Sequence, residues 1–147
     1  MSPITGSIEI ARAPQDVFDY ATDLKRQGEW QEAIVDIEVE TEGPTRVGTK
    51  ASETRKVPGG TRTFPFEITA HDPPSTSSFK VTGGPVRPEG TMTFTPLDGG
   101  TRTRVDFEME FHGHGLGVLL LPIVNRDAKK LVPKDLALLK QRLESAS

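Results

Sequence analysis

The sequence predicts an α+β domain in which a curved antiparallel sheet of about six to seven strands surrounds a long C-terminal helix. Apolar and polar residues alternate along several segments between residues 35 and 112, as in strands with one buried face. Clusters of glycine and proline separate these segments, as expected for hairpin turns. From Leu116 to about Leu143 the leucines instead recur at helical spacing.

The N-terminal segment predicts a short strand followed by a short helical hairpin. Apolar and polar residues alternate over Ile4 to Ala11, which indicates a strand with one buried face. Pro14 suits the first position of a helix, and Asp16 favours its positive end. Apolar residues then follow at helical spacing: Val17, Phe18, Ala21 and Leu24. We expect Gly28 to end or interrupt this helical region.

The middle of the chain predicts six further strands, joined mainly by tight turns. The strand patterns lie at residues 35–39, 49–57, 64–70, 79–81, 92–94 and 104–111. Pro65 removes one hydrogen-bond donor from the third of these strands, so we expect that end to lie at an edge or a bulge. Asp98, Gly99 and Gly100 form a strong hairpin signal before the last strand.

The C-terminal helix is predicted to cover the apolar face of the sheet. If unbroken, a helix of roughly 30 residues would be about 45 Å long. Pro122 and Pro133 are expected to bend or divide it. The residues expected to pack against the sheet are Leu116, Leu119, Leu120, Ile123, Val124, Leu131, Leu136, Leu139 and Leu143.

Composition excludes several classes of protein. A chain of 147 residues is typical of a single domain, here residues 1–147. The absence of cysteine excludes disulfides, thiolate metal sites and cysteine nucleophiles. A net charge of -3 with interspersed signs argues against nucleic-acid binding. No apolar run approaches the ~20 residues of a membrane span, and the N-terminus lacks signal-peptide features. We therefore expect a cytoplasmic protein without stable membrane insertion, and no oligomeric state is predicted.

Five stretches in order carry a resemblance to a known family. They are Ile10 to Phe18, Trp30, Val47 to Thr49, Asp72 to Pro74, and Gly99 to Arg102. Their order, over nearly the whole chain, resembles the START-like (SRPBCC) superfamily, in its polyketide cyclase/dehydrase and lipid-transport branch. The resemblance implies the helix-grip fold, with an apolar cavity for a small hydrophobic or amphipathic molecule between the sheet and the C-terminal helix.

Aromatic and methionine side chains on the predicted strands are the expected walls of this cavity. The alternative is that they fill an ordinary core, as such residues usually do. The predicted ligand-binding residues are Trp30, Phe64, Phe66, Phe79, Met92, Phe94, Phe107, Met109, Leu120 and Ile123.

Three polar side chains are weak candidates for catalysis: Glu53, Arg55 and Tyr20. Glu53 and Arg55 lie on one face of their strand by alternation. If that face is concave, the pair could orient a polar ligand group or polarise a carbonyl. The alternative is an exposed polar strand. Tyr20 could donate a hydrogen bond to a ligand, or it could simply pack against the sheet.

No metal or cofactor is predicted. His112 and His114 would point to the same side of a strand, but no third ligand follows at a recognisable spacing. The glycines between Gly113 and Gly117 lack the lysine and hydroxyl of a phosphate loop. No serine lies in a nucleophile-elbow pattern.

Three functions are consistent with these patterns. The first is binding, by carrying or sequestering a small hydrophobic molecule. The second is an aromatase/cyclase-type enzyme that folds a polyketide-like substrate for ring closure. The third is a protein-interaction module, which would need an exposed apolar patch. The outer strand positions are mostly charged, so the sequence gives no sign of such a patch.

Overall fold

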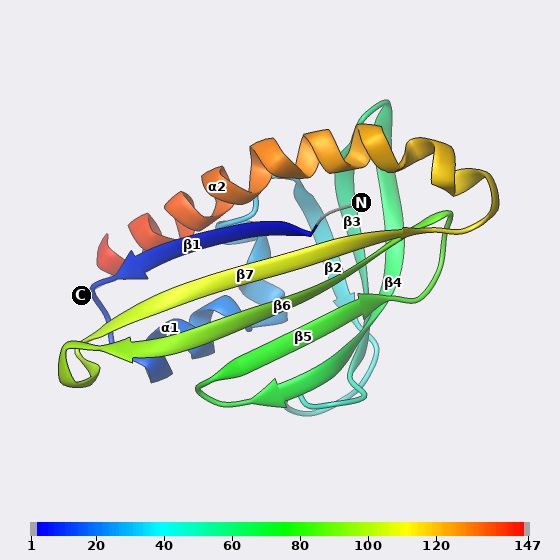
Figure 1. The fold of residues 1–147 in the computed structure, drawn as a ribbon. Helices are drawn as coiled ribbons and strands as arrows, with labels where there is room; N and C mark the ends of the chain where they lie inside the picture. Colours follow the sequence, from blue (N-terminus) through cyan, green and yellow to red (C-terminus); the bar gives the residue numbers. More distant parts are fainter. Residues whose placement is uncertain (1–2, 146–147) are drawn as a thin grey trace.

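The computed structural model describes residues 3–145 and shows a seven-stranded antiparallel sheet that curves around a long C-terminal helix (Figure 1). The strands are β1 (Ile4–Ile10), β2 (Ile34–Val39), β3 (Lys50–Val57), β4 (Gly60–Asp72), β5 (Thr76–Val81), β6 (Val86–Leu97) and β7 (Arg102–Gly113). The helices are α1 (Pro14–Ala21) and α2 (Leu121–Ser145), with 3-10 helices η1 (Leu24–Glu29), η2 (Asp98–Gly100) and η3 (Gly115–Leu120). This architecture confirms the predicted α+β helix-grip fold.

The sheet has the order β1-β7-β6-β5-β4-β3-β2. The strands from β2 to β7 each pair with the next in sequence, and β1 pairs with β7, with Ile4 opposite Met109 and Ile10 opposite Thr103. Figure 1 shows α2, coloured orange to red, running alongside β1. The first strand therefore lies between the last strand and the last helix.

The helical region after β1 consists of one α-helix and one 3-10 helix. Pro14 begins α1, as predicted. After α1, the side chain of Asp23 caps η1 by accepting a hydrogen bond of 3.2 Å from the backbone N–H of Lys25. The predicted hairpin is thus a short α-helix followed by a single 3-10 segment.

Pro65 lies within an inner strand. β4 is flanked by β3 and β5, and the backbone N–H of Thr82 donates to the Pro65 carbonyl at 2.9 Å. The N–H and C=O of one strand residue point to the same side, so the donor that Pro65 lacks would face β5. Because Pro65 cannot donate to Thr82 in return, the paired ladder between β4 and β5 ends at Phe66 and Val81. The irregular register of β4 lies elsewhere, between Ile68 and Ala70.

The predicted C-terminal helix is divided near its start. η3 precedes α2, and Pro122 is the second residue of α2, whereas Pro133 lies inside it. The expectation that Leu116 and Leu119 pack against the sheet is wrong, because they are 83% and 73% exposed. The helical stripe that does pack is made of Asn125, Ala128, Val132, Leu136, Leu139 and Leu143. No helix within residues 3–145 is long and apolar enough to span a bilayer.

The C-terminal half of α2 closes one end of the molecule, which we call the closed end. Here α2 approaches β1 at Gly6, where an added Cβ would lie 2.8 Å from Leu136 Cδ1 and 2.9 Å from Val132 Cγ1. Leu139 and Val105 are fully buried in the same cluster.

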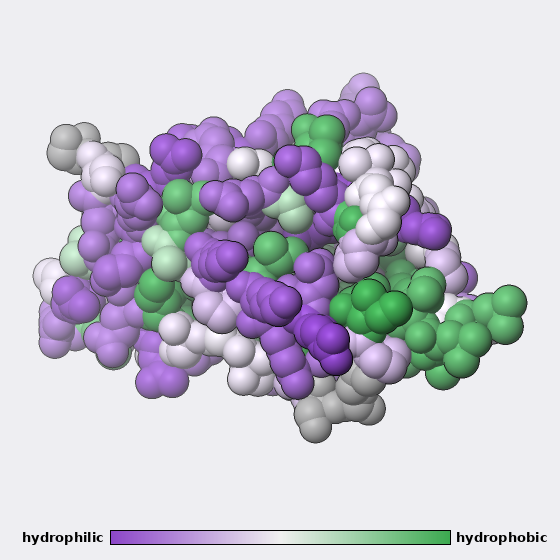
Figure 2. Space-filling view, turned by 90° about the horizontal axis from the view of Figure 1, so that it is seen from above, coloured by the Kyte–Doolittle hydropathy of each residue, from purple (hydrophilic) through white to green (hydrophobic). Residues whose placement is uncertain are grey.

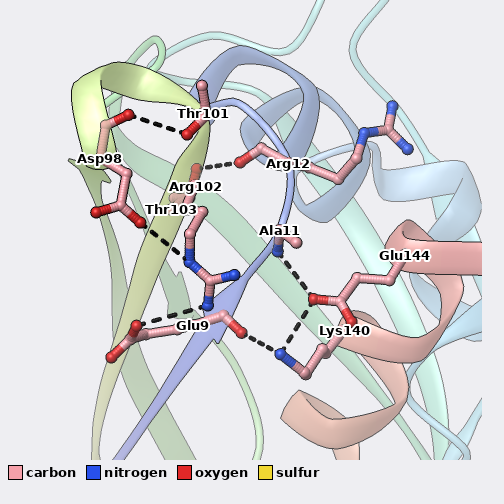
Figure 3. A network of polar contacts seen from close by, with 9 residues as sticks. All are labelled: Glu9, Ala11, Arg12, Asp98, Thr101, Arg102, Thr103, Lys140 and Glu144. Atoms are coloured by element: carbon pink, nitrogen blue, oxygen red, sulfur yellow. Dashed lines mark hydrogen bonds and ion pairs between the residues drawn. The ribbon is translucent and has the colours of Figure 1, made fainter.

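Polar contacts fasten the closed end at its rim (Figure 3). The backbone N–H of Ala11 donates to Glu144 at 2.8 Å, and Lys140 Nζ lies 3.0 Å from the same carboxylate. The buried Thr103 hydroxyl donates to the Arg12 carbonyl at 2.8 Å. These contacts tie the end of β1 both to the start of β7 and to the end of α2.

Candidate ligand-binding cavity

A cavity of about 350 Å³ lies between the sheet and the N-terminal half of α2, at what we call the open end. Its walls come from α1, η1, strands β3 to β7, η3 and α2. A second hollow of about 380 Å³ lies on the solvent-facing side of β1, β6 and β7, lined by groups such as Thr5, Arg104 and Asp106. That hollow is open and has no enclosing apolar walls, so the first cavity is the candidate site.

The cavity walls are largely apolar. The predicted ligand-binding residues that line it are Trp30, Phe64, Phe66, Phe79, Met92, Phe107, Met109, Leu120 and Ile123. Phe94 is the exception, because it packs edge-on against Phe18 in the closed end, with ring centroids 5.2 Å apart. The ring nitrogen of Trp30 is buried and has no hydrogen-bond partner among the described residues.

A glycine in β6 shapes the floor of the cavity. An added Cβ on Gly90 would lie 2.5 Å from Phe79 Cε1 and 3.3 Å from Phe107 Cε1. Phe79 in turn packs edge-on against Phe66, with centroids 6.5 Å apart. The missing side chain of Gly90 therefore lets two aromatic rings lie close over the sheet, and these rings form the apolar wall.

One part of the wall is charged. Arg55 and Glu53 both line the cavity from β3, and Arg55 Nη1 donates to Glu53 Oε1 at 2.9 Å. Their side chains are only 25% and 17% exposed. Of the two alternatives left open by the sequence, the structure places this pair on the cavity side of the strand.

A third charged group, Asp135, joins this pair from α2 and was not singled out in the sequence. Burial raises the pKa of Asp135 to about 6, while the positive charge of Arg55 and a hydrogen bond from the Glu32 backbone oppose that rise. A signal was present, since Asp127, Leu131 and Asp135 recur every four residues and all line the cavity. We call Glu53, Arg55 and Asp135 the charged cluster.

Tyr20, the remaining catalytic candidate, is not among the residues that line the cavity. Its hydroxyl donates to Glu29 Oε1 at 3.1 Å, and the Arg26 guanidinium lies 4.6 Å from the ring centroid. Partial burial, followed by the hydrogen bond to Glu29, raises the pKa of Tyr20. Its contacts are those of a side chain that joins α1 to η1.

The histidines lie apart from the charged cluster. His112 Nε2 is 3.5 Å from Glu89 Oε2, between half-exposed side chains. The ring of His71 packs on Phe18 at 5.2 Å, and burial lowers its pKa. Within residues 3–145 no three potential metal ligands come together.

The arrangement combines a largely apolar chamber with a charged cluster in its wall. Arg55 offers charge-assisted hydrogen bonds to a carbonyl or carboxylate oxygen. Asp135, with a pKa of about 6, can accept or donate a proton near neutral pH. The site can therefore hold a molecule that has an apolar body and one polar group.

Comparisons with known proteins agree with this architecture. The family model described as polyketide cyclase / dehydrase and lipid transport matches residues 1–144. No functionally curated protein matches the chain in sequence.

Solved structures extend the likeness. TTHA0849 from Thermus thermophilus has a TM-score of 0.80 and 22% identity, with 99% of both chains covered. The Zhui aromatase/cyclase from Streptomyces sp. R1128 has a TM-score of 0.82 and 14% identity, covering 97% of this chain and 93% of that one. The di-domain ARO/CYC BexL of the BE-7585A biosynthetic pathway has a TM-score of 0.76 and 16% identity, covering 98% of this chain and 47% of BexL.

These identities show a common fold, whereas the family model matches nearly the whole sequence. The cavity between sheet and helix is the place where this fold offers room for a small molecule. The chain belongs to the polyketide cyclase/dehydrase and lipid transport family, within the START-like (SRPBCC) superfamily.

Proposed function

We propose that the chain binds a small amphipathic molecule, with its apolar body against the aromatic wall and its polar group at the charged cluster. The main supporting observation is that Glu53, Arg55 and Asp135 come from two elements to one wall of a largely apolar cavity, whose other charged lining residues are Lys56, Arg62 and Asp127. The volume of about 350 Å³ lies within the ~300–1,000 Å³ of most small-molecule sites.

The electrostatics of the cluster favour a ligand with a carbonyl or hydroxyl group. Withdrawing charges from water is costly unless each is paired, and Glu53 satisfies only part of the Arg55 guanidinium. A ligand oxygen can accept from the remaining N–H groups. Asp135 can donate to the same ligand when protonated or accept from it when ionised.

The first experiment is native mass spectrometry of the purified protein, followed by denaturing extraction of whatever is bound. We expect a co-purifying amphipathic molecule, whose affinity for re-added protein is then measured by titration. Arg55→Gln should weaken that affinity by about tenfold or more, as expected for a charge-assisted hydrogen bond.

The matched control is Arg104→Gln. Arg104 pairs with Asp106 two residues along β7 at 3.1 Å, on the solvent-facing side of the sheet. It therefore repeats the spacing of Arg55 and Glu53 away from the cavity, and its loss should leave affinity unchanged. Equal affinities for wild type and the Arg55→Gln variant would refute the proposed orientation of the ligand.

A second candidate function, an aromatase/cyclase-type enzyme, is favoured by the position of Asp135. In that reaction Asp135 would take a proton from a carbon next to a ketone, and Arg55 would stabilise the resulting enolate oxygen. The enolate carbon would then attack a second carbonyl, and the alkoxide formed there would take the proton back from Asp135. The turnover of a poly-β-ketone substrate should then rise with pH through about 6, where Asp135 ionises. Asp135→Asn should abolish turnover while binding persists, and full turnover by this variant would exclude the mechanism.

A further inference from the structure

An exposed apolar surface lies beside the mouth of the cavity. Four large apolar side chains of η3 and the first turn of α2 are unusually exposed: Leu116 (83%), Leu119 (73%), Val118 (53%) and Ile123 (53%). Figure 2, which looks onto the molecule from above, shows apolar surface gathered at one end. We call these four residues the apolar tip.

The tip is held in place by its backbone. The N–H of His114 donates to the Pro85 carbonyl at 2.8 Å, and the N–H of Gly117 donates to the His114 carbonyl at 3.0 Å. Gly117 lies so close to Pro85 that an added Cβ would be 1.9 Å from the Pro85 oxygen. Because the glycine backbone is what packs, the neighbouring leucines are directed away from the protein.

Basic residues continue from the tip along the outer face of α2. Arg126, Lys129, Lys130 and Lys134 are all exposed. Lys130 and Lys134 follow Ile123 by seven and eleven residues, so all three share one helix face. Asp127 is the one acidic residue from 115 to 134, and it faces the cavity.

These cations are uncompensated within the described part of the chain, where none of the four forms an ion pair. The whole chain carries a net charge of -3, so this positively charged face is opposite in sign to the chain as a whole. Apolar side chains that project beside a row of basic residues match the interface of an anionic bilayer, where each basic residue gains by its nearness to acidic headgroups.

We propose that the apolar tip and the basic face of α2 dock on the surface of a bilayer that contains anionic lipids. The tip enters the boundary between headgroups and acyl chains, and Arg126, Lys130 and Lys134 contact the headgroups. Leu120 and Ile123 also line the cavity, so docking brings the mouth to the bilayer. Exchange of a ligand through that mouth rests on the proposed function, whereas docking itself does not.

The test is flotation of the full chain with vesicles of phosphatidylcholine alone, and with vesicles of equimolar phosphatidylcholine and phosphatidylglycerol. We expect binding to the anionic vesicles that weakens as salt is raised. Leu116→Ser/Leu119→Ser and, separately, Lys130→Glu/Lys134→Glu should each reduce partition by at least about tenfold. Arg55→Gln should bind vesicles like wild type, which separates docking from ligand binding.

Two control variants are matched to these changes. Val35→Ser/Val47→Ser removes two apolar side chains that are 55% and 62% exposed elsewhere, and Lys25→Glu/Lys50→Glu makes the same charge change at other exposed positions. Both should retain binding. Failure of wild type to bind anionic vesicles, or undiminished binding by Leu116→Ser/Leu119→Ser, would overturn the proposal. A different result would assign the tip to contact between copies of the chain instead. In that case the wild type would not bind vesicles but would self-associate in sedimentation velocity, and Leu116→Ser/Leu119→Ser would abolish that self-association.

Discussion

The two halves of α2 pack differently against the same sheet. Toward its C-terminal end, Leu139 and Leu143 are buried against the core formed with β1, β7 and α1. Toward its N-terminal end, Leu131 and Asp135 line a cavity instead. The difference teaches that one helix can anchor a fold with half of its length and leave the other half free to form a site.

The largest expected effect is a contrast between two leucines of α2. Leu139→Ala should cost about 2–5 kcal/mol of unfolding free energy, because Leu139 is fully buried and its truncation would leave a gap in the core. Leu131→Ala, which only enlarges the existing cavity, should cost about 1 kcal/mol. Urea denaturation of both variants measures the change in the free energy of unfolding. Equal changes would show that the two ends of the helix are equally well packed.

The next contrast uses two glycines. Gly6→Ala should cost about 1–3 kcal/mol, since the new methyl meets the buried side chains of Leu136 and Val132 where α2 packs on β1. Gly90→Ala should cost less, because Phe79 can swing into the cavity to make room. Thermal unfolding gives both values. A larger loss for Gly90→Ala would mean that Phe79 is fixed as tightly as the closed end.

Asp135 provides a pH-dependent comparison. Its pKa is raised to about 6 in the folded state from an ordinary value of 3.8. The cost in stability therefore develops as the pH rises from about 4 to about 6, is complete above pH 6, and is absent below pH 4, where Asp135 is protonated in both states. Asp135→Asn should therefore stabilise the protein by about 1–2 kcal/mol at pH 8 and by nothing at pH 3. Melting temperatures measured from pH 3 to pH 8 test this, with Asp36→Asn at an exposed position as the control. A gain in stability from Asp135→Asn that did not depend on pH would contradict the prediction.

The smallest effect is expected at the rim of the closed end. The hydrogen bond from the Ala11 backbone, then that from Lys140, lowers the pKa of Glu144. A lowered pKa contributes stability above the ordinary value of 4.5 that disappears as the pH falls through the folded pKa. Glu144→Gln should cost about 0.5 kcal/mol at pH 7 and less at pH 3. A cost that grows on acidification would refute the assignment.

Alternation predicted the strands and most of their buried faces, although Val35 is 55% exposed beside the register shift in β2. It did not place residues along the cavity. Met92 and Phe94 share one face of β6, yet Met92 lines the cavity and Phe94 is packed with Phe18. The reason is that β6 runs from the open end toward the closed end. Periodicity identifies the face of a strand, whereas the distance between sheet and helix depends on the tertiary structure.

Helical periodicity failed in two further places. Leu116 and Leu119 continue the apolar stripe in sequence but lie on η3, where the backbone of Gly117 makes the contact with Pro85. No pattern in the sequence therefore indicated an exposed apolar patch at this end. Asp135 was not singled out, because only the leucines of the stripe were considered as residues that face the sheet.

The order of the sheet has a consequence for how the chain is made. The hairpins from β2 to β5 join neighbouring segments, so each can form soon after it leaves the ribosome. β1 must wait for β7, with Ile4 opposite Met109, and α2 follows later still. Such long sequence separations slow folding. During synthesis β1 therefore remains unpaired until β7 has been made, and the closed end, which needs both β7 and α2, is the last region to assemble.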